Sequence, residues 1–288
     1  LSGIVVSVHA AATGHPGMAI GNALGGIAAQ TVFLTIADIT FRPANIEHAA
    51  ASTPNMLQAA LLTTLLALPL MASASPDFAL LGVSPYSLLL FAGYGLGLWL
   101  SSGIRRQEPW APRQTRHTVL EDDESMPEKL QSASMARLWG VFAVLALVLG
   151  TCGYMVSRTG IALAERYQIS ETVVGTYLTA VSTSLPELVT ALAAVHRGAL
   201  ALAVGDILGG NAFDTLLVAL SDVAYRDGSI YAHFESPHVL TTGMAQVLTG
   251  LILMGLIRRE QHGVANIGFE SMLSLLFYLA GAAILFGS

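Results

Sequence analysis

The stretch that decides the fold runs from Thr183 to Asp214 and reads TSLPELVTALAAVHRGALALAVGDILGGNAFD. It is almost entirely apolar or small, yet it holds three carboxylates, Glu187, Asp206 and Asp214. Carboxylates inside segments this hydrophobic are costly in lipid, and they usually face a bundle interior or an ion pathway. The stretch therefore predicts transmembrane helices that build a polar site, and we expect the rest of the chain to hold that site in a membrane.

The composition of the whole chain also indicates a membrane protein. Of 288 residues, 53% are hydrophobic and 11% are charged, with a mean hydropathy of +0.63, whereas a soluble domain carries about 25% charged residues. The single cysteine excludes a disulfide within the chain. Twelve arginines against one lysine, with abundant alanine, are typical of a GC-rich bacterial genome. We therefore expect a multi-pass protein of the bacterial cell membrane, with the lipid bilayer rather than nucleic acid as its partner; the sequence leaves the oligomeric state open.

Nine segments are apolar enough to be membrane spans, which need about 20 mainly apolar residues. The first is incomplete, because the sequence begins without a methionine inside an apolar run. We expect residues 160–170 to form a separate short surface helix ahead of the sixth span. The nine expected spans are 1–13, 17–40, 55–75, 78–102, 136–157, 171–196, 199–222, 236–257 and 265–287.

One long polar loop separates two groups of spans. Residues 103–135 contain three prolines and charges of both signs, which favours a flexible linker between a first half, 1–102, and a second half, 136–288. If the spans alternate in direction, ten Arg and Lys residues lie on the linker side and three on the other side. Because positive residues accumulate inside, this distribution makes the linker cytoplasmic.

The chain contains an internal repeat. Residues 1–42 align without a gap on residues 185–226, with 13 of 42 positions identical. The identities include four glycines, an aspartate and an arginine, which apolar composition alone would not align. One period of the repeat, counted from the start of the first copy to the start of the second, holds five expected spans. Five is an odd number, so the second copy must enter the membrane from the opposite side. Inverted repeats of this kind, with interrupted helices near the midplane, are the sequence signature of secondary transporters.

The residues around the quoted stretch also resemble a known family. The string TYLTAVSTSLPELVTALAAVHRG, followed by LALAVGDILGGNAFDTLLV, is similar to the second α-repeat of the sodium/calcium exchanger superfamily of cation/Ca²⁺ antiporters. The resemblance implies an all-α polytopic fold of two inverted five-helix repeats, with the first helix and the start of the second missing at the N-terminus. It also implies exchange of Na⁺ or H⁺ for Ca²⁺ or another cation by alternating access, without a cofactor and without enzymatic activity.

The start of the quoted stretch can build part of a cation site. Thr183, Ser184 and Glu187 are spaced i, i+1, i+4, so that two hydroxyls and a carboxylate share one face of a helix. Pro186 has no N–H, and the carbonyl of Ser182 therefore loses its helical partner. Such a freed carbonyl can bind a cation, and a buried carboxylate such as Glu187 can alternate between a proton and a cation.

The end of the stretch adds an amide and a second carboxylate. Asn211 and Asp214 share a face at i, i+3, and the pair Gly209-Gly210 permits close approach or local unwinding. Carboxylate, amide, hydroxyl and carbonyl oxygens are the ligands of hard cations. The resemblance implies a metal site with Glu187 and Asp214 as principal ligands and Thr183, Ser184 and Asn211 in support.

The first copy of the repeat departs from the family pattern at the ligand positions. Gly3 stands opposite Glu187, and Gln30 stands opposite Asp214. The polar candidates that remain in this copy are Asn22, Gln30 and Thr31. The site therefore offers two central carboxylates instead of the three common in calcium-transporting members. Because calcium affinity depends on the number of charged ligands, this favours a monovalent, Na⁺/H⁺ type of exchange.

Other interpretations of the same residues stay open. Asp206 is a candidate proton site, or it lies near a helix start in water. The alternative function is a transport-inactive homologue that acts as a membrane scaffold, and the incomplete first copy is its motive. An intramembrane hydrolase with Ser184 as nucleophile is disfavoured, because the chain has no G-x-S-x-G or H-E-x-x-H motif.

Overall fold

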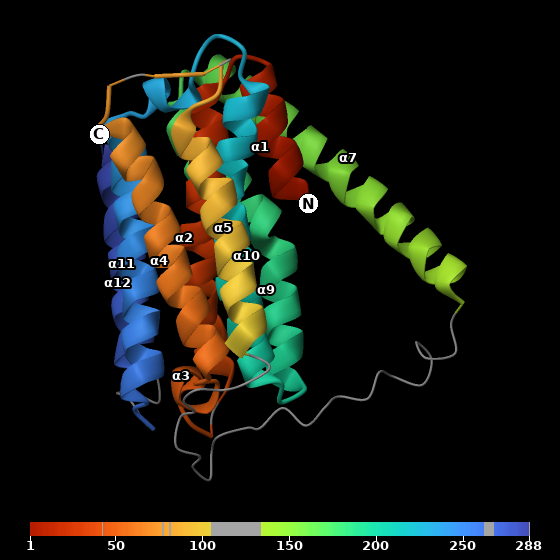
Figure 1. Cartoon of the computed structure of the whole chain (residues 1–288), viewed down its shortest axis with the longest axis vertical. Helices are drawn as coiled ribbons and strands as arrows, with labels where there is room; N and C mark the ends of the chain where they lie inside the picture. Colours follow the sequence, from red (N-terminus) through yellow and green to blue (C-terminus); the bar gives the residue numbers. More distant parts are fainter. Residues whose placement is uncertain (42, 77, 81, 105–133, 262–267, 288) are drawn as a thin grey trace.

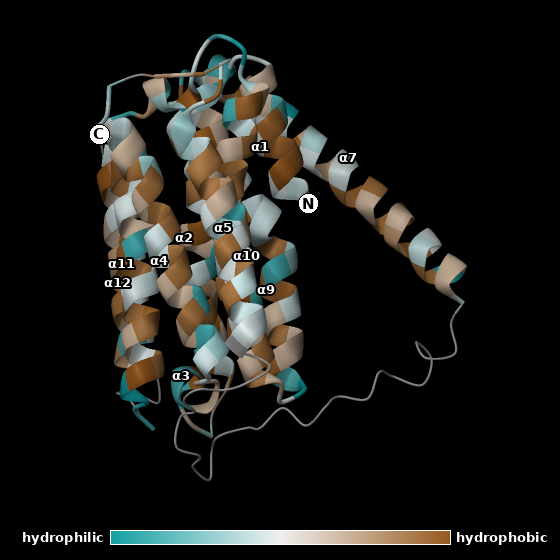
Figure 2. Ribbon diagram, viewed as in Figure 1, coloured by the Kyte–Doolittle hydropathy of each residue, from teal (hydrophilic) through white to brown (hydrophobic). Residues whose placement is uncertain are grey.

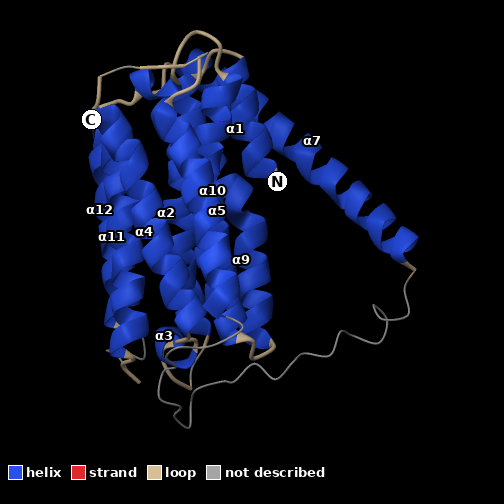
Figure 3. Ribbon diagram, in the orientation of Figure 1, coloured by secondary structure: helices blue, strands red, loops and turns tan. Residues whose placement is uncertain are grey.

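The computed structural model describes residues 1–288 except 42, 77, 81, 105–133, 262–267 and 288. The described part is a bundle of long helices joined by short loops (Figures 1 and 3). Most of the expected linker and its prolines lie outside the described residues. The helices are α1 (Ser2–Ala12), α2 (Pro16–Thr40), α3 (Ile46–Ala49), α4 (Thr53–Ser73), α5 (Pro85–Ile104), α7 (Met135–Tyr167), α8 (Glu171–Val173), the π-helical η1 (Val174–Thr179), α9 (Ala180–His196), α10 (Leu200–Ala224), the 3₁₀ turn η2 (Ile230–His233), α11 (Ser236–Arg258) and α12 (Phe269–Gly287).

The outer surface of this bundle is apolar. Seven of the described helices are long and apolar enough to cross a membrane, and Figure 2 shows hydrophobic residues along most of their length. Large apolar side chains such as Trp139, Leu147 and Phe286 are more than half exposed. Such a surface is unfavourable in water and suits lipid. The chain is an all-α, multi-pass integral membrane protein, as the sequence predicts.

Each of the nine expected spans contains a helix, but two boundaries differ. The expected surface helix at 160–170 is wrong, because α7 runs unbroken from Met135 to Tyr167. Its buried residues are the small Gly153, Ser157, Gly160 and Ala164, spaced at helical intervals. This stripe lets α7 pack closely on α1 and η1 beyond the expected end of the span. The other difference is α5, which begins at Pro85 rather than near residue 78.

The central helix of the bundle is α2, which contacts α1, α9, α10, α11 and α12. Its glycines allow the backbone of η1 to approach closely. A Cβ added at Gly25 would lie 2.6 Å from the Cα of Thr176, and one added at Gly175 would lie 2.6 Å from the carbonyl oxygen of Met18. Real side chains cannot occupy such spaces, so glycine is required on both sides of this crossing. The π-helical turn that makes this contact directly precedes α9.

The internal repeat is visible in the contacts. The helices α2 and α10 have the same length of 25 residues and begin at equivalent positions of the two copies, Pro16 and Leu200. Asp38 accepts hydrogen bonds from the backbone N–H groups of Ile46 (2.8 Å) and Gly268 (2.9 Å). Its counterpart Asp222 accepts the corresponding bonds from the equivalent residues, Ile230 (2.8 Å) and Ser84 (2.7 Å). The same pattern of hydrogen bonds to an aspartate therefore occurs at the ends of both α2 and α10, which supports the inverted-repeat interpretation.

Candidate functional site

The three helices α2, α9 and α10, together with α1, enclose a small cavity of about 20 Å³. Glu187 and Asp214 meet there with Gln30, although Gln30 belongs to the other copy of the repeat. A cavity of this size has room for one or two waters, or for a single cation without its hydration shell. The residues that line it are Leu1, Gly3, Ile4, Asn22, Gly26, Gln30, Thr183, Ser184, Glu187, Asp214 and Leu217.

Gln30 is the polar centre of the cavity. Its Nε2 donates to Asp214 Oδ2 at 2.9 Å and lies 3.2 Å from Ser184 Oγ, so that one amide from α2 contacts both α9 and α10. Its Oε1 is buried and accepts no hydrogen bond from the described residues, and the same holds for Glu187 Oε2. Unpaired buried oxygens are costly. The cavity therefore holds oxygens that a cation or an added proton would satisfy.

Asn22 joins α2 to α1, η1 and α9 at the cavity. Its Oδ1 accepts from Thr179 Oγ1 at 2.9 Å and from Thr183 Oγ1 at 3.5 Å, while its Nδ2 donates to Ser7 Oγ at 2.9 Å. Sequence reasoning missed Thr179 and Ser7. The signal for Thr179 was present, since it precedes Thr183 by one helical turn and shares its face. Ser7 could be found only from the packing of α1 on α2.

Two of the expected ligands lie beside the cavity and do not line it. Asn211 is fully buried, and its Nδ2 donates to Thr31 Oγ1 at 2.9 Å and to the carbonyl of Ile27 at 3.3 Å. The contact between Asn211 and Thr31 joins α10 to α2 next to Gln30, which precedes Thr31 in the chain. Asp206 lies apart from the cavity as well: it is exposed and accepts a hydrogen bond from Thr190 at 3.3 Å.

The glycine pair of α10 acts by close approach. The helix continues without a break from Leu200 to Ala224, so local unwinding at Gly209-Gly210 is not observed. A Cβ at Gly209 would lie 3.3 Å from Gln58 Nε2, and one at Gly210 would lie 3.9 Å from Gln30 Oε1. The missing side chains let the amides of α4 and α2 reach the surface of α10. Pro186 likewise lies inside a helix that continues on both sides of it.

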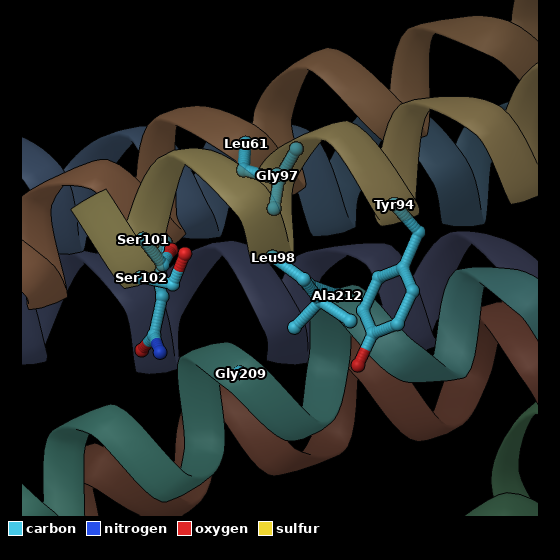
Figure 4. A pocket seen from close by; sticks show the side chains of 9 residues that line it. Leu61, Tyr94, Gly97, Leu98, Ser101, Ser102, Gly209 and Ala212 are labelled. Carbon is cyan, nitrogen blue, oxygen red and sulfur yellow. The ribbon is translucent and has the colours of Figure 1, made fainter.

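A second, larger cavity of about 380 Å³ lies between α4, α5 and α10. Figure 4 shows Tyr94 and Leu98 of α5 directed toward Gly209 and Ala212 of α10. The Tyr94 ring also packs edge-on against the ring of Phe213, with the centroids 5.9 Å apart. Phe213 directly precedes Asp214 in the chain. The cavity extends along α5 from this ring to Ser101 and Ser102 in the last turns of the helix. It thus reaches from the neighbourhood of the small cavity toward one end of the bundle.

Comparison with known proteins identifies the family. A family model described as "Sodium/calcium exchanger protein" matches residues 137–287, which is more than half of the chain. The chain belongs to the sodium/calcium exchanger family. Its members are transporters, which is consistent with the expectation that this protein is not an enzyme. Among the described residues, no group of three or more His, Cys, Asp or Glu side chains is arranged to hold a metal ion. The small cavity is lined by two carboxylates, those of Glu187 and Asp214.

Relatives in this family include three curated proteins. The chain is 30% identical over 149 residues to the inner membrane protein YrbG of Escherichia coli (strain K12), which is 51% of this chain and 45% of YrbG. It is 32% identical over 143 residues to the sodium/calcium exchanger MaX1 of Methanosarcina acetivorans, 48% of this chain and 40% of that one. It is 26% identical to the putative antiporter CaxA of Alkalimonas amylolytica, over 99% of this chain and 83% of CaxA. The chain spans less than half the length of YrbG and of MaX1. The bacterial relatives YrbG and CaxA support the expected location in a bacterial membrane.

Solved structures of exchangers share the fold. The crystal structure of the H⁺/Ca²⁺ exchanger CAX superposes with a TM-score of 0.64 and 14% identity, covering 99% of this chain and 74% of that one. The sodium-calcium exchanger NCX_Mj superposes with a TM-score of 0.57 and 19% identity, covering 98% and 82%. The similarity of fold extends over nearly the whole chain, including the part before residue 137 that lies outside the matched family region.

Proposed function

We propose that this family member is a secondary active cation antiporter that holds its transported ion between Glu187 and Asp214. The observation that carries the proposal is the convergence of both carboxylates with Gln30 in a cavity that fits one small cation. A scaffold protein would gain stability by filling this space with apolar side chains, since buried polar groups without partners are costly. The oxygen-rich lining is completed by Asn22, Thr183 and Ser184. The hydrogen bond between Asn211 and Thr31 holds α10 and α2 together beside this lining.

The charge of the cavity favours a monovalent ion. It contains two carboxylates, and the position opposite Asp214 holds the neutral Gln30. Calcium sites reach high affinity through several charged ligands and six to eight oxygens. Exchange of Na⁺ against H⁺ needs less, because a carboxylate that loses a proton can take the monovalent cation in its place. Na⁺/H⁺-type exchange is therefore the form of antiport that this donor set supports best.

Gln30 would serve both occupancies of the site. Its Nε2 donates to Asp214 in the present arrangement, while its Oε1 has no hydrogen-bond partner among the described residues. Rotation of the amide would exchange donor for acceptor and present Oε1 to a cation. We infer that the same side chain closes the cavity without a metal ion and ligates the metal ion when one binds.

Alternating access would move the inverted halves, 1–102 and 136–288, against each other around this cavity. The larger cavity between α4, α5 and α10 is the proposed path from one membrane face, with Tyr94 between it and Asp214. On this proposal the present arrangement is closed toward the site, because the rings of Tyr94 and Phe213 are in contact.

The test is ion flux in liposomes that contain the full-length protein. A pH gradient should drive uptake of ²²Na⁺, and Glu187→Gln or Asp214→Asn should reduce the rate at least about tenfold, because each removes a charged ligand. Asp206→Asn is the matched control, since it neutralises an exposed carboxylate on the same helix as Asp214. Unchanged flux in Glu187→Gln would refute the ligand assignment. A folded wild-type protein that moves no cation would support the scaffold alternative.

A further inference from the structure

A second group of carboxylates lies near α3, which Figure 1 shows at one end of the bundle. None of them lines the small cavity that holds Glu187 and Asp214, called the exchange cavity below. Asp38 comes from the end of α2, Glu47 from α3 and Glu270 from the first turn of α12. Their side chains are 0%, 2% and 1% exposed. Three buried acids in one place are unfavourable unless something compensates their charge.

Both carboxylate oxygens of Asp38 have hydrogen-bond donors, whereas each of the two glutamates has an oxygen with no donor among the described residues. Both oxygens of Asp38 accept backbone N–H groups, as described above. Glu47 Oε1 accepts from Ser271 Oγ at 3.1 Å, but Glu47 Oε2 and Glu270 Oε1 accept no hydrogen bond from the described residues. The side chain of Asn45, which is 1% exposed, adds a third buried oxygen that no described residue donates to. Among the described residues, the cluster therefore has fewer donors than acceptor oxygens.

The two glutamates face each other across two glycines. A Cβ at Gly268 would lie 3.2 Å from Glu270 Oε2, 3.3 Å from Glu47 Oε2 and 3.5 Å from the side-chain nitrogen of Asn45. A Cβ at Gly255 would lie 2.9 Å from Glu270 Cγ and 3.0 Å from Glu47 Cγ. Both acidic side chains and the amide thus gather around the same point, and the glycines leave the space that they occupy.

The other copy of the repeat shows that the fold does not require glutamates here. Asp222 takes the place of Asp38, and in the same register Glu47 corresponds to Tyr231 and Glu270 to Tyr86. The two tyrosine rings lie next to each other, with centroids 6.5 Å apart. Neutral hydroxyls therefore fill the positions that the carboxylates occupy at the opposite end. The acid pair is a local property of the α3 end, not a demand of the architecture.

The charged groups around the pair have other described contacts. Arg258 lies 3.6 Å from Glu260 and stacks on the ring of Phe269 at 5.0 Å. His48 Nδ1 lies 2.7 Å from the carbonyl of Arg259, and the Arg259 guanidinium donates to the carbonyl of His48 at 3.3 Å. Within the part of the chain that the structure describes, neither Glu47 nor Glu270 forms a salt bridge.

We propose that Glu47 and Glu270 bind one proton between them and form a proton site separate from the exchange cavity. A proton on either acid supplies the missing donor and removes one of two like charges. Burial, followed by the neighbouring charge of Asp38, raises the pKa of Glu47 to about 8, which agrees with a proton held at neutral pH. Loss of this proton would make the two carboxylates repel, and α3 and α12 would separate at this end of α2. The inference does not depend on the proposed transport activity.

The direct test is infrared difference spectroscopy of the purified full-length protein between about pH 6 and pH 9, on either side of that pKa. The background carries Glu187→Gln and Asp214→Asn, so that the exchange cavity contributes no carboxyl signal. We expect a protonated carboxyl band that shifts in D₂O and disappears as the pH rises, and that is absent after Glu47→Gln or Glu270→Gln. Asp206→Asn should leave it unchanged. An identical band in both glutamine variants, or a band that responds to Na⁺ or Ca²⁺ instead of pH, would overturn the proposal.

Thermal stability gives a second readout that does not depend on spectral assignment. The folded pKa of Glu47 lies above its ordinary value of 4.5, so between the two pH values the folded protein holds a proton that the unfolded chain has released. Stability must therefore fall as the pH rises through this window and level off above about 8. Glu47→Gln should flatten this decline. A decline as steep in Glu47→Gln and Glu270→Gln as in the wild type would contradict the proton site.

Discussion

The helices α2 and α10 have the same length and share three glycines at equivalent positions, but they differ in chemistry. Both run for 25 residues, and each closes its end with an aspartate. Where α10 carries Asn211 and Asp214, α2 carries Ile27 and Gln30, and both of these residues contact their own counterparts across the site. A contact between equivalent residues is what a two-fold axis through the site demands. The carboxylates of the site all come from α9 and α10, while α2 supplies amides.

This comparison distinguishes the residues that determine helix packing from the residues that the proposed function assigns to ion binding. The glycines and the terminal aspartates are present in both copies because they decide how closely helices pack and how the ends close. The ligand positions differ, since Ile27 and Gln30 of α2 stand where α10 has Asn211 and Asp214, so the packing of the two helices does not require the same side chains in both copies. A degenerate first copy therefore leaves the fold in place, and on the proposed function it changes the ion selectivity of the site. Two pairs of substitutions at equivalent positions test how alike the two copies are in packing, and the pair with the larger expected effect comes first.

The two glycines that correspond in the repeat, Gly25 and Gly209, should differ greatly in their tolerance of a methyl group. A Cβ at Gly25 meets the backbone of Thr176 at 2.6 Å, while one at Gly209 meets only the end of the Gln58 side chain at 3.3 Å. Overpacking costs about 1–3 kcal/mol, and backbone contacts give way least. Gly25→Ala should therefore lower the melting temperature strongly or prevent folding, and Gly209→Ala should shift it little. Equal shifts for the two variants in a thermal unfolding assay would refute the close crossing of α2 and η1.

The terminal aspartates should contribute unequally to stability. Asp222 accepts from two backbone N–H groups and from the hydroxyls of Ser87 (2.7 Å) and Ser229 (3.2 Å), whereas Asp38 has its two backbone donors and shares one hydroxyl, that of Ser271, with a neighbouring acid. Hydrogen bonds to charged groups contribute about 1.5–3 kcal/mol each. Asp222→Asn should therefore lower the melting temperature more than Asp38→Asn. The comparison is made in one detergent at one pH, and an equal or larger loss from Asp38→Asn would contradict this ranking.

Much of the fold followed from the sequence, because its signals are local or periodic. Apolar length predicted the spans, and the gapless repeat brought Gln30 into the site opposite Asp214. The end of α7 was missed because its stripe of small residues contacts helices that the local sequence does not reveal. The choice between unwinding and close approach at Gly209-Gly210 stayed open for a related reason, since glycine permits both and only the neighbouring amide decides between them.

The acid pair of Glu47 and Glu270 lies beyond sequence reasoning for a different reason. The two residues are far apart in the chain, and neither falls in the aligned part of the repeat, whose first copy ends at residue 42. Their proximity depends on how α3 and α12 pack against the end of α2. The sequence named most of the polar residues that line the small cavity, but it did not show that Asn211 and Thr31 lie beside the cavity, because this depends on how α2 and α10 pack.

The most direct test of the account compares ²²Na⁺ and ⁴⁵Ca²⁺ uptake driven by a pH gradient in the same liposomes, for wild type and Gln30→Glu. The substitution keeps the shape of the side chain and turns the donor opposite Asp214 into a third carboxylate. The account predicts Na⁺/H⁺ exchange with little Ca²⁺ uptake in the wild type, and a gain in the Ca²⁺-to-Na⁺ ratio of at least about tenfold in Gln30→Glu, because divalent affinity rises with ligand charge. Wild-type Ca²⁺ uptake as fast as Na⁺ uptake, with no change in the variant, would contradict it.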